Sequence, residues 1–437
     1  MLRYAEESYC RGSKKEPVLR DREAWNRWDV LSSSERSLAG SCGRLRDADP
    51  GDLSGRYPIR FFVAVMSEWP VRQRVPRFVA TVRGAQLLMH DPITDHCVLL
   101  TGAGGSIGSA LAKEIVKRRP QSLILLDQSE NNLHQIDCEL SALRGGDVCV
   151  PILGDFGDAA LLAEIFGEHA PDLVIHAAAF KHVSFMERNP IPAIRNNAVG
   201  TNLLAETAHK YGVSALVMVS TDKAVNPRSV MGASKRVAEL ALLRWSEPPS
   251  AMRAVRLGNV LGSAGSVVPI FQRQISAGGP VTVTHPDANR YFIELRDAVE
   301  RVLLAAAMER ESGILMSDPG EPVRILDLAH RLIEEAGFKP EVDIPIAIIG
   351  LRPGEKMSEE FVSGRESVHA SACAKLHLIE TPQPSCEEFD AAMAALKECA
   401  DRHDVSGLLE RLCRLVPEYQ PSDLVLASAR AAQTAAS

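Results

Sequence analysis

The sequence predicts an α/β fold in which a doubly wound parallel sheet is followed by a smaller C-terminal lobe. Two patterns predict this fold. From Cys97 onward, short apolar runs alternate with longer stretches that carry apolar residues at i, i+3 and i+4 spacing. The short runs lack polar alternation, as expected for strands that helices cover on both faces. Strands and helices that alternate in this way build a doubly wound sheet with right-handed crossovers.

Six buried parallel strands are expected in chain order, at residues 97–101, 123–126, 148–153, 173–177, 216–220 and 254–257. The clearest helices between them are expected at residues 107–118, 197–211 and 233–243. After residue 259 the chain becomes richer in Gly and Pro and then contains a helical pattern near residues 295–308. A last helical pattern covers residues 386–416 and precedes an Ala/Ser-rich tail.

These patterns divide the chain into four parts. Residues 1–95 are a poorly defined N-terminal extension, because no helical or strand period persists there, and they form either a partly ordered or disordered extension or a small helical appendage that packs on the main domain. Residues 96–258 form the main sheet domain, 259–365 the smaller lobe, and 366–437 a C-terminal helical segment and tail.

Composition excludes several classes of protein. The formal charge of -7 gives no general attraction to nucleic acid or anionic lipid. The nine cysteines are scattered without a C-x-x-C pair, which favours a reducing, cytoplasmic location and gives no metal signature. No apolar run approaches the roughly 20 residues that span a bilayer, and the first 15 residues lack the apolar centre of a signal peptide.

A glycine-rich segment after the first strand predicts a dinucleotide site. Gly102, Gly105 and Gly108 lie between that strand and the next helix, where glycine lets the backbone approach a pyrophosphate and the helix N-terminus stabilises its charge. Ser106 and Ile107 belong to the same turn. Further contacts are expected after the next three strands, from Asp127 to the adenosine ribose, Asp155 to the adenine edge, and Ala177 and Ala178 beside the dinucleotide. Because Asp127 would repel a 2′-phosphate and no Arg follows it, NAD is favoured over NADP.

Several longer motifs make the assignment more specific. They are TGAGGSIGS at 101, HAAAFKHV at 176, NNAVGTNLLAE at 196, VSTDKAVNP at 219, MGASK at 231, GNVLGSAGSVVP at 258, VTVTHPDANRYF at 281 and GLRPGEK at 350. Over residues 98–360 the sequence resembles the extended short-chain dehydrogenase/reductases, which have a Rossmann domain. Within them it resembles the polysaccharide-biosynthesis family of UDP-N-acetylglucosamine 4,6-dehydratases. Longer relatives carry transmembrane helices and a further domain before this region. Residues 1–95 are therefore expected to reflect a short form or a rearranged start.

The resemblance implies catalytic roles for residues at the end of the fifth strand and in the following helix. Thr221 would hydrogen-bond the C4 oxygen of the sugar, Asp222 would protonate the departing C6 hydroxyl, and Lys223 would take the C5 proton. A low pKa of Lys223 is expected if the site is desolvated and Lys235 lies nearby. Lys235 would hold the nicotinamide ribose. Met231 stands where the wider superfamily has Tyr.

A thioether cannot take the C4 hydroxyl proton as a Tyr phenolate does, so Met231 leaves two alternatives. In the first, a bound water that Thr221 and Lys235 orient is the base. In the second, Asp222 or Lys223 takes this proton as well. The sequence does not choose between them.

The resemblance also implies residues that bind the substrate, a UDP-sugar. Lys181 and His182 would face the cofactor and the sugar, and Asn197 would contact the cofactor. Arg290 and Arg352 would clamp the pyrophosphate, because guanidinium groups offer paired donors to phosphate oxygens. The other expected substrate contacts are Asn259, Ser266, Val267, Thr282, Thr284 and Glu355.

The resulting hypothesis is an NAD-dependent 4,6-dehydratase of a UDP-N-acetylhexosamine for surface polysaccharide or other glycan synthesis, active as a homo-oligomer. An alternative enzyme is a nucleotide-sugar 4-epimerase or a 5-epimerising dehydratase. Asp222 and Lys223 favour dehydration, because a simple 4-epimerase needs neither an acid at C6 nor a base at C5. A third alternative is a non-catalytic relative that binds NAD and UDP-sugar. No metal is expected.

Overall fold

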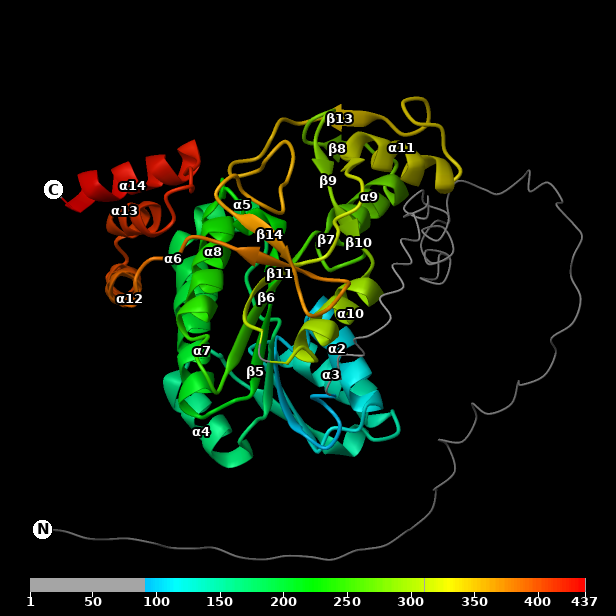
Figure 1. Cartoon of the computed structure of the whole chain (residues 1–437). Coiled ribbons are helices and arrows are strands. Elements are labelled where there is room, and N and C mark those ends of the chain that lie inside the picture. Colours follow the sequence, from blue (N-terminus) through cyan, green and yellow to red (C-terminus); the bar gives the residue numbers. More distant parts are fainter. Residues whose placement is uncertain (1–90, 310, 437) are drawn as a thin grey trace, which may run out of the picture. The chain divides into compact units, whose positions relative to one another are not determined.

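The computed structural model describes residues 91–309 and 311–436, and it is built around one nine-stranded sheet (Figure 1). Seven strands run parallel, and the last two continue the edge as an antiparallel hairpin. The spatial order is β14 (Ser367–Ala370), β15 (His377–Glu380), β11 (Gly313–Met316), β6 (Ala251–Leu257), β5 (Ala215–Thr221), β4 (Leu173–His176), β1 (Cys97–Thr101), β2 (Ser122–Asp127) and β3 (Cys149–Leu153).

Helices cover both faces of this sheet, because alternate residues of each strand carry apolar side chains into two separate cores. One core is closed by α2 (Ser106–Lys117), α3 (Glu130–Ser141) and α10 (Leu295–Ala306), and the other by α4 (Ala159–His169), α7 (Thr201–Lys210) and α8 (Val230–Arg244). The predicted doubly wound α/β fold is therefore confirmed. All six expected strands are present, and β3 to β6 follow the strand order of dinucleotide-binding domains.

The lobe after residue 259 has a small core of its own. It contains α9 (Val267–Ser276), α11 (Ile325–Glu335) and the parallel pair β8 (Val281–Val283) and β13 (Ile346–Ile348). The same region contains two further strand pairs: β7 (Asn259–Val260) with β10 (Phe292–Ile293), and β9 (Asn289–Arg290) with β12 (Val323–Arg324).

The C-terminal segment packs on the main domain rather than forming a separate body. Residues 366–437 begin with the hairpin β14–β15, which the helical pattern did not predict, and continue with α12 (Cys386–Asp401), α13 (Val405–Leu415) and α14 (Asp423–Ala436). These helices share a third core with α5 (Val183–Arg188), α6 (Pro190–Ile194) and the outer side of α8. A π-helical turn, Arg195–Gly200, joins α6 to α7, so the helix expected from residue 197 begins at Thr201.

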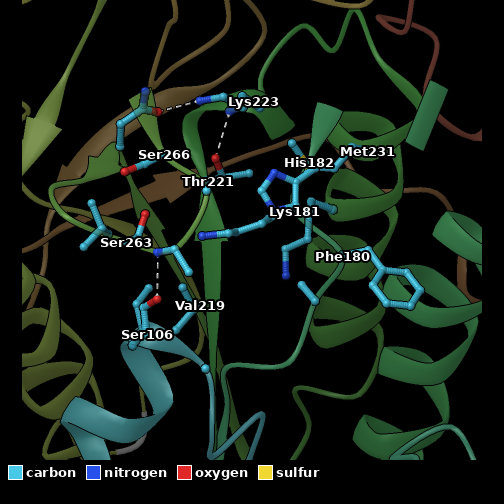
Figure 2. A pocket seen from close by; sticks show the side chains of 18 of the residues that line it. Ser106, Phe180, Lys181, His182, Val219, Thr221, Lys223, Met231, Ser263 and Ser266 are labelled. Carbon is cyan, nitrogen blue, oxygen red and sulfur yellow. Dashed lines mark hydrogen bonds between the residues drawn. The ribbon is translucent and has the colours of Figure 1, made fainter. Parts of the chain in front are cut away.

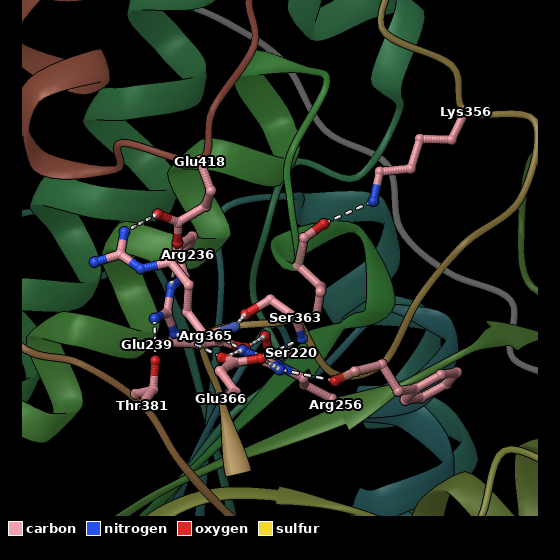
Figure 3. Close-up of polar contacts among 12 residues, drawn as sticks. Ser220, Arg236, Glu239, Arg256, Lys356, Ser363, Arg365, Glu366, Thr381 and Glu418 are labelled. Carbon is pink, nitrogen blue, oxygen red and sulfur yellow. Dashed lines mark hydrogen bonds and ion pairs between the residues drawn. The ribbon is translucent and has the colours of Figure 1, made fainter.

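A buried ionic network ties the sheet to this C-terminal segment (Figure 3). The Glu239 carboxylate on α8 accepts hydrogen bonds from Ser220 Oγ at 2.7 Å, from Arg256 Nε at 2.9 Å and from Arg236 Nη1 at 3.0 Å. Arg256 also donates to Glu366 at 2.8 and 3.0 Å. Burial opposes ionisation of Glu239, but the two guanidinium groups outweigh it and lower its pKa to about 2. The network therefore fixes the end of β5, where the expected catalytic residues lie.

Residues 1–90 of the expected N-terminal extension lie outside the described residues. Across the described part of the chain, none of the helices combines the length and apolar character needed to cross a membrane.

Candidate functional site

A cavity of about 670 Å³ opens at the carboxyl ends of β1, β4, β5 and β6, the edge where open α/β sheets bind ligands (Figure 2). Fourteen of the residues expected from the sequence line it, which is more than half of the predicted set. They are Gly105, Ser106, Ile107, Gly108, Ala177, Lys181, His182, Thr221, Lys223, Met231, Lys235, Asn259, Ser266 and Val267.

The glycine-rich turn leaves no room for side chains. Gly102 has a φ of +68°, and a Cβ there would lie 2.6 Å from the Ala178 backbone nitrogen. A Cβ on Gly108 would lie 2.0 Å from the Gly102 carbonyl oxygen. Ser106 begins α2 and accepts a hydrogen bond from the Ala264 N–H at 3.1 Å, which joins the turn to the loop after β7. A bare backbone before a helix N-terminus fits a dinucleotide pyrophosphate.

A second cavity, of about 140 Å³, adjoins this turn and is lined by Gly102, Asp127, Ala178 and their neighbours. The Asp127 carboxylate accepts hydrogen bonds from the N–H groups of Gly104 and Ser129, both at 2.9 Å. Asp127 therefore shapes the turn from the end of β2, and its position at this cavity is compatible with an adenosine ribose.

Asp155 and Asn197 line neither of these cavities. Asp155 accepts a hydrogen bond from the Gly157 N–H at 2.8 Å, while its chain neighbours Gly154 and Phe156 line the smaller cavity. Asn197 is buried and holds the turn at Phe180, whose N–H and C=O it binds at 2.8 and 2.9 Å. Their contacts with a cofactor stay predictions.

Thr221, Asp222 and Lys223 form a hydrogen-bonded group where β5 ends in a 3₁₀ turn. Asp222 Oδ1 accepts from Thr221 Oγ1 at 2.8 Å and from Lys223 Nζ at 2.9 Å. Lys223 Nζ also donates to Asn259 Oδ1 at 2.8 Å. The Asp222 side chain is fully buried beneath the cavity, and its Oδ2 has no hydrogen-bond partner among the described residues. The fold thus brings an acid and an amine together, with Lys223 at the cavity wall and Asp222 beneath it.

The environment of this group differs from the expectation for Lys223. Burial raises the pKa of Asp222, and the nearby Glu359 raises it further. Burial alone would lower the pKa of Lys223, but Asp222 and Glu359 outweigh burial, so the pKa of Lys223 is raised. The expected low pKa of Lys223 is therefore wrong for this arrangement, because the sequence did not reveal the second carboxylate.

Met231 and Lys235 lie one turn apart on α8 and both line the cavity. The helix begins after Ser229, whose Oγ accepts a hydrogen bond from the Gly232 N–H at 3.0 Å. Lys235 is 4% exposed, and burial lowers its pKa from 10.5 to about 8 although Glu239 opposes the shift. The lowered pKa in this chain therefore belongs to Lys235 rather than Lys223.

The residues expected to bind the nucleotide sugar fall into two groups. The first group lines this cavity and consists of Lys181, His182, Asn259, Ser266 and Val267 (Figure 2). Of these, Lys181 and His182 are exposed to solvent. The others, Thr282, Thr284, Arg290, Arg352 and Glu355, do not line it.

Polar contacts within the smaller lobe hold this second group. Glu355 Oε1 accepts from Thr284 Oγ1 and Arg290 Nη2, both at 3.0 Å. Thr282 is paired with Gln274. Arg352 and Glu355 line a separate polar cavity of about 870 Å³. Their binding roles stay predictions.

Sequence reasoning missed Glu359, which is 4% exposed and lies 3.6 Å from Lys223 Nζ. The sequence contained only one weak signal, an acidic pair shortly after the GLRPGEK motif. Among the described residues, no group of three His, Cys, Asp or Glu side chains could hold a metal ion.

Comparison with known families gives a match over most of the described region. Residues 98–381 match the family described as "Polysaccharide biosynthesis protein". The capsular polysaccharide biosynthesis protein CapD of Staphylococcus aureus is 43% identical over 325 residues, which are 74% of this chain and 50% of CapD. The chain thus spans about half the length of this relative.

Two shorter relatives are known by their activities. UDP-N-acetylglucosamine 4,6-dehydratase (inverting) of Campylobacter jejuni is 32% identical over 277 residues, 62% of this chain and 78% of that protein. UDP-glucose 4-epimerase of Rickettsia prowazekii is 33% identical over 286 residues, 63% of this chain and 80% of that protein.

Solved structures share the fold. Pen from Bacillus thuringiensis matches with a TM-score of 0.61 and 29% identity, over 66% of this chain and 90% of that one. DesIV of Streptomyces venezuelae, a dTDP-glucose 4,6-dehydratase solved with NAD and TYD bound, matches with a TM-score of 0.52 and 22% identity, over 61% and 88%.

Proposed function

The chain belongs to the polysaccharide biosynthesis protein family of the extended short-chain dehydrogenase/reductases, and from this premise we propose that it is a nucleotide-sugar 4,6-dehydratase. The proposed substrate is UDP-N-acetylglucosamine or a close UDP-N-acetylhexosamine, and the proposed cofactor is NAD. The product would be the 4-keto-6-deoxy sugar nucleotide, used for surface polysaccharide or other glycan synthesis. Because of the family and the cysteine pattern, we propose that the reaction takes place in the cytoplasm. A homo-oligomer, which the resemblance implies, stays a prediction.

One observation carries this proposal: Lys223, which lines the same cavity as the glycine-rich turn, is joined by a 2.9 Å hydrogen bond to Asp222, which is fully buried beneath it. A 4,6-dehydration removes a proton from C5 and expels water from C6, so it needs one base and one acid close together. This pair supplies both. The 32% identity with the Campylobacter jejuni dehydratase supports the same assignment.

The pair can complete the proton transfers and return to its starting state. A proton can pass from Lys223 Nζ to Asp222 Oδ1 along their hydrogen bond; the raised pKa of Asp222 favours this shift, and the raised pKa of Lys223 opposes it. The neutral Lys223 amine then takes the C5 proton, and the Asp222 carboxylic acid protonates the leaving C6 hydroxyl. Both groups end in the protonation states in which they began.

The remaining residues would bind and orient. Thr221 Oγ1 would turn its single proton from Asp222 Oδ1 to the C4 oxygen, and Lys235 would hold the nicotinamide ribose. NAD, when bound, would accept hydride from C4 and return it to C6, so it would not be consumed. Because Asp222 and Lys223 serve C6 and C5, we favour a water held by Thr221 and Lys235 as acceptor of the C4 hydroxyl proton. The NAD-bound DesIV structure and the position of Asp127 support the choice of cofactor.

The test is to incubate the purified chain with NAD and UDP-N-acetylglucosamine and to identify the product by mass spectrometry and NMR. We expect loss of one water and a keto carbon at C4. The 33% identity with a UDP-glucose 4-epimerase makes epimerisation the second candidate. An isomer of unchanged mass with inverted C4 would support the epimerase, and an unchanged sugar despite measured binding would support a non-catalytic protein.

A further inference from the structure

Glu359 is a buried carboxylate that lies among three cationic side chains. Its Oε1 lies 3.6 Å from Lys223 Nζ and 3.8 Å from Arg290 Nε, and its Oε2 lies 3.6 Å from Lys356 Nζ. Oε2 accepts no hydrogen bond from any described residue. One oxygen of this carboxylate, Oε1, therefore lies near both the proposed C5 base, Lys223, and Arg290, which is proposed to bind the diphosphate.

Glu359 belongs to a cluster of ion pairs. Three carboxylates, Asp222, Glu355 and Glu359, face three cations, Lys223, Arg290 and Lys356. A nucleotide diphosphate that enters this cluster brings further negative charge and must compete with carboxylates for Arg290. Charges removed from water are stable only when paired, so the diphosphate would have to replace a carboxylate at Arg290.

Arg290 has little freedom in the present arrangement. Its guanidinium donates to Glu355 at 3.0 Å and to the Lys356 and Met357 carbonyl oxygens at 2.8 and 3.1 Å, and it is 6% exposed. Lys356 is held on the other side by the Val225 carbonyl oxygen at 2.6 Å, at the end of the turn that carries Asp222 and Lys223. A movement of Arg290 toward a phosphate would therefore change the surroundings of Glu359 and Lys223 together.

We propose that Glu359 is a positioning residue with two partners: it holds Lys223 beside Asp222, and together with the hydrogen-bonded Glu355 it competes with a nucleotide diphosphate for Arg290. The inference rests on the proposed function, because it assumes that Arg290 receives the diphosphate and that Lys223 acts at C5. In addition to that function, Glu359 would compete with the substrate diphosphate for Arg290 and would also position Lys223 beside Asp222.

The test uses the full chain with NAD and the variant Glu359→Gln, which removes the charge and keeps the size. UDP affinity is measured by calorimetry, and turnover of UDP-N-acetylglucosamine by NMR. We expect UDP to bind about tenfold more tightly, because a competing negative charge is gone. We expect turnover to fall, because Lys223 loses one of the groups that hold it. Loss of structure would instead weaken binding and turnover together.

Two further variants make the result decisive. Glu164→Gln removes the same charge at an exposed position on α4, away from the cavities, and should leave UDP affinity and turnover at wild-type values. Glu359→Asp keeps the charge, so it should bind UDP as the wild type does and recover part of the turnover. The inference is overturned if Glu359→Gln binds UDP no more tightly than the wild type, or if its turnover is unchanged. If the wild type binds UDP but yields no keto sugar, the proposed function fails, whereas a wild type that dehydrates normally isolates the failure to Glu359.

Discussion

Replacing Lys235 by Met should stabilise the cofactor-free protein at neutral pH while it abolishes turnover. Lys235 on α8 is 4% exposed, and its pKa lies at about 8 because burial disfavours the ammonium form. Met has a side chain of similar length without the charge. The variant therefore removes a buried cation and also the group proposed to hold the nicotinamide ribose.

The expected size of the effect follows from the pKa. Its drop from 10.5 to about 8 corresponds to about 3 kcal/mol, at about 1.4 kcal/mol per unit. Below pH 8 the lysine is protonated in both the folded and the unfolded protein, so this penalty is present in full. Between pH 8 and 10.5 the unfolded chain binds more protons, and the wild type gains stability as the pH rises. The thioether that replaces the amine in the variant does not titrate, so it contributes no such dependence.

Urea denaturation of the cofactor-free protein at pH 7 and at pH 10 measures this difference. We expect Lys235→Met to raise the free energy of unfolding at pH 7 by up to about 3 kcal/mol. We also expect the variant to lack most of the increase in this free energy that the wild type shows between pH 7 and pH 10. Lys210→Met, at an exposed position on α7, is the matched control and should change neither. A Lys235→Met protein that is less stable than the wild type at pH 7, or that keeps the wild-type pH dependence, would refute the reasoning.

Three further results are expected. Gly108→Ala places a Cβ 2.0 Å from the Gly102 carbonyl oxygen and should abolish NAD binding in a calorimetric titration, whereas Gly167→Ala, with no atom within 4 Å, should bind NAD normally. Glu239→Ala removes the carboxylate that Arg256 and Arg236 share, leaving Arg256 with Glu366 and Arg236 with Glu366 and Glu418, and should lower the free energy of unfolding in urea by about 3 kcal/mol; a loss below about 1 kcal/mol would contradict the role of the network. Asp222→Asn should keep NAD and UDP binding but form less than about a hundredth of the keto product, the usual size of an acid–base contribution, and near-normal product would exclude Asp222 as the acid.

The sequence predicted the main sheet well because strands covered on both faces are continuous apolar runs. The hairpin β14–β15 was missed because its first strand lacks such an apolar run. Every residue of β14 is exposed, so its sequence, Ser-Val-His-Ala, lacks that signal. It pairs with the sheet edge because β15 places Ile379 opposite Ile314 of β11, a contact between segments far apart in the chain.

The same difference separates the site residues that the sequence predicted from the one that it missed. Residues that follow a strand end, such as Thr221, reach the cavity because the carboxyl ends of parallel strands share one edge. Glu359 comes from a loop, and only the packing of that loop on the end of β5 brings it to Lys223. The direction of the Lys223 pKa could not be predicted without this contact, since burial and the two carboxylates act in opposite directions.

The most direct test of the central claim is to run the reaction in D₂O with UDP-N-acetylglucosamine that carries tritium at C4, and to locate both labels in the product. A 4,6-dehydration with an internal hydride return predicts solvent deuterium at C5 and tritium at C6 of a 4-keto-6-deoxy sugar. A product with tritium still at C4 and no deuterium at C5 would contradict the account and favour epimerisation.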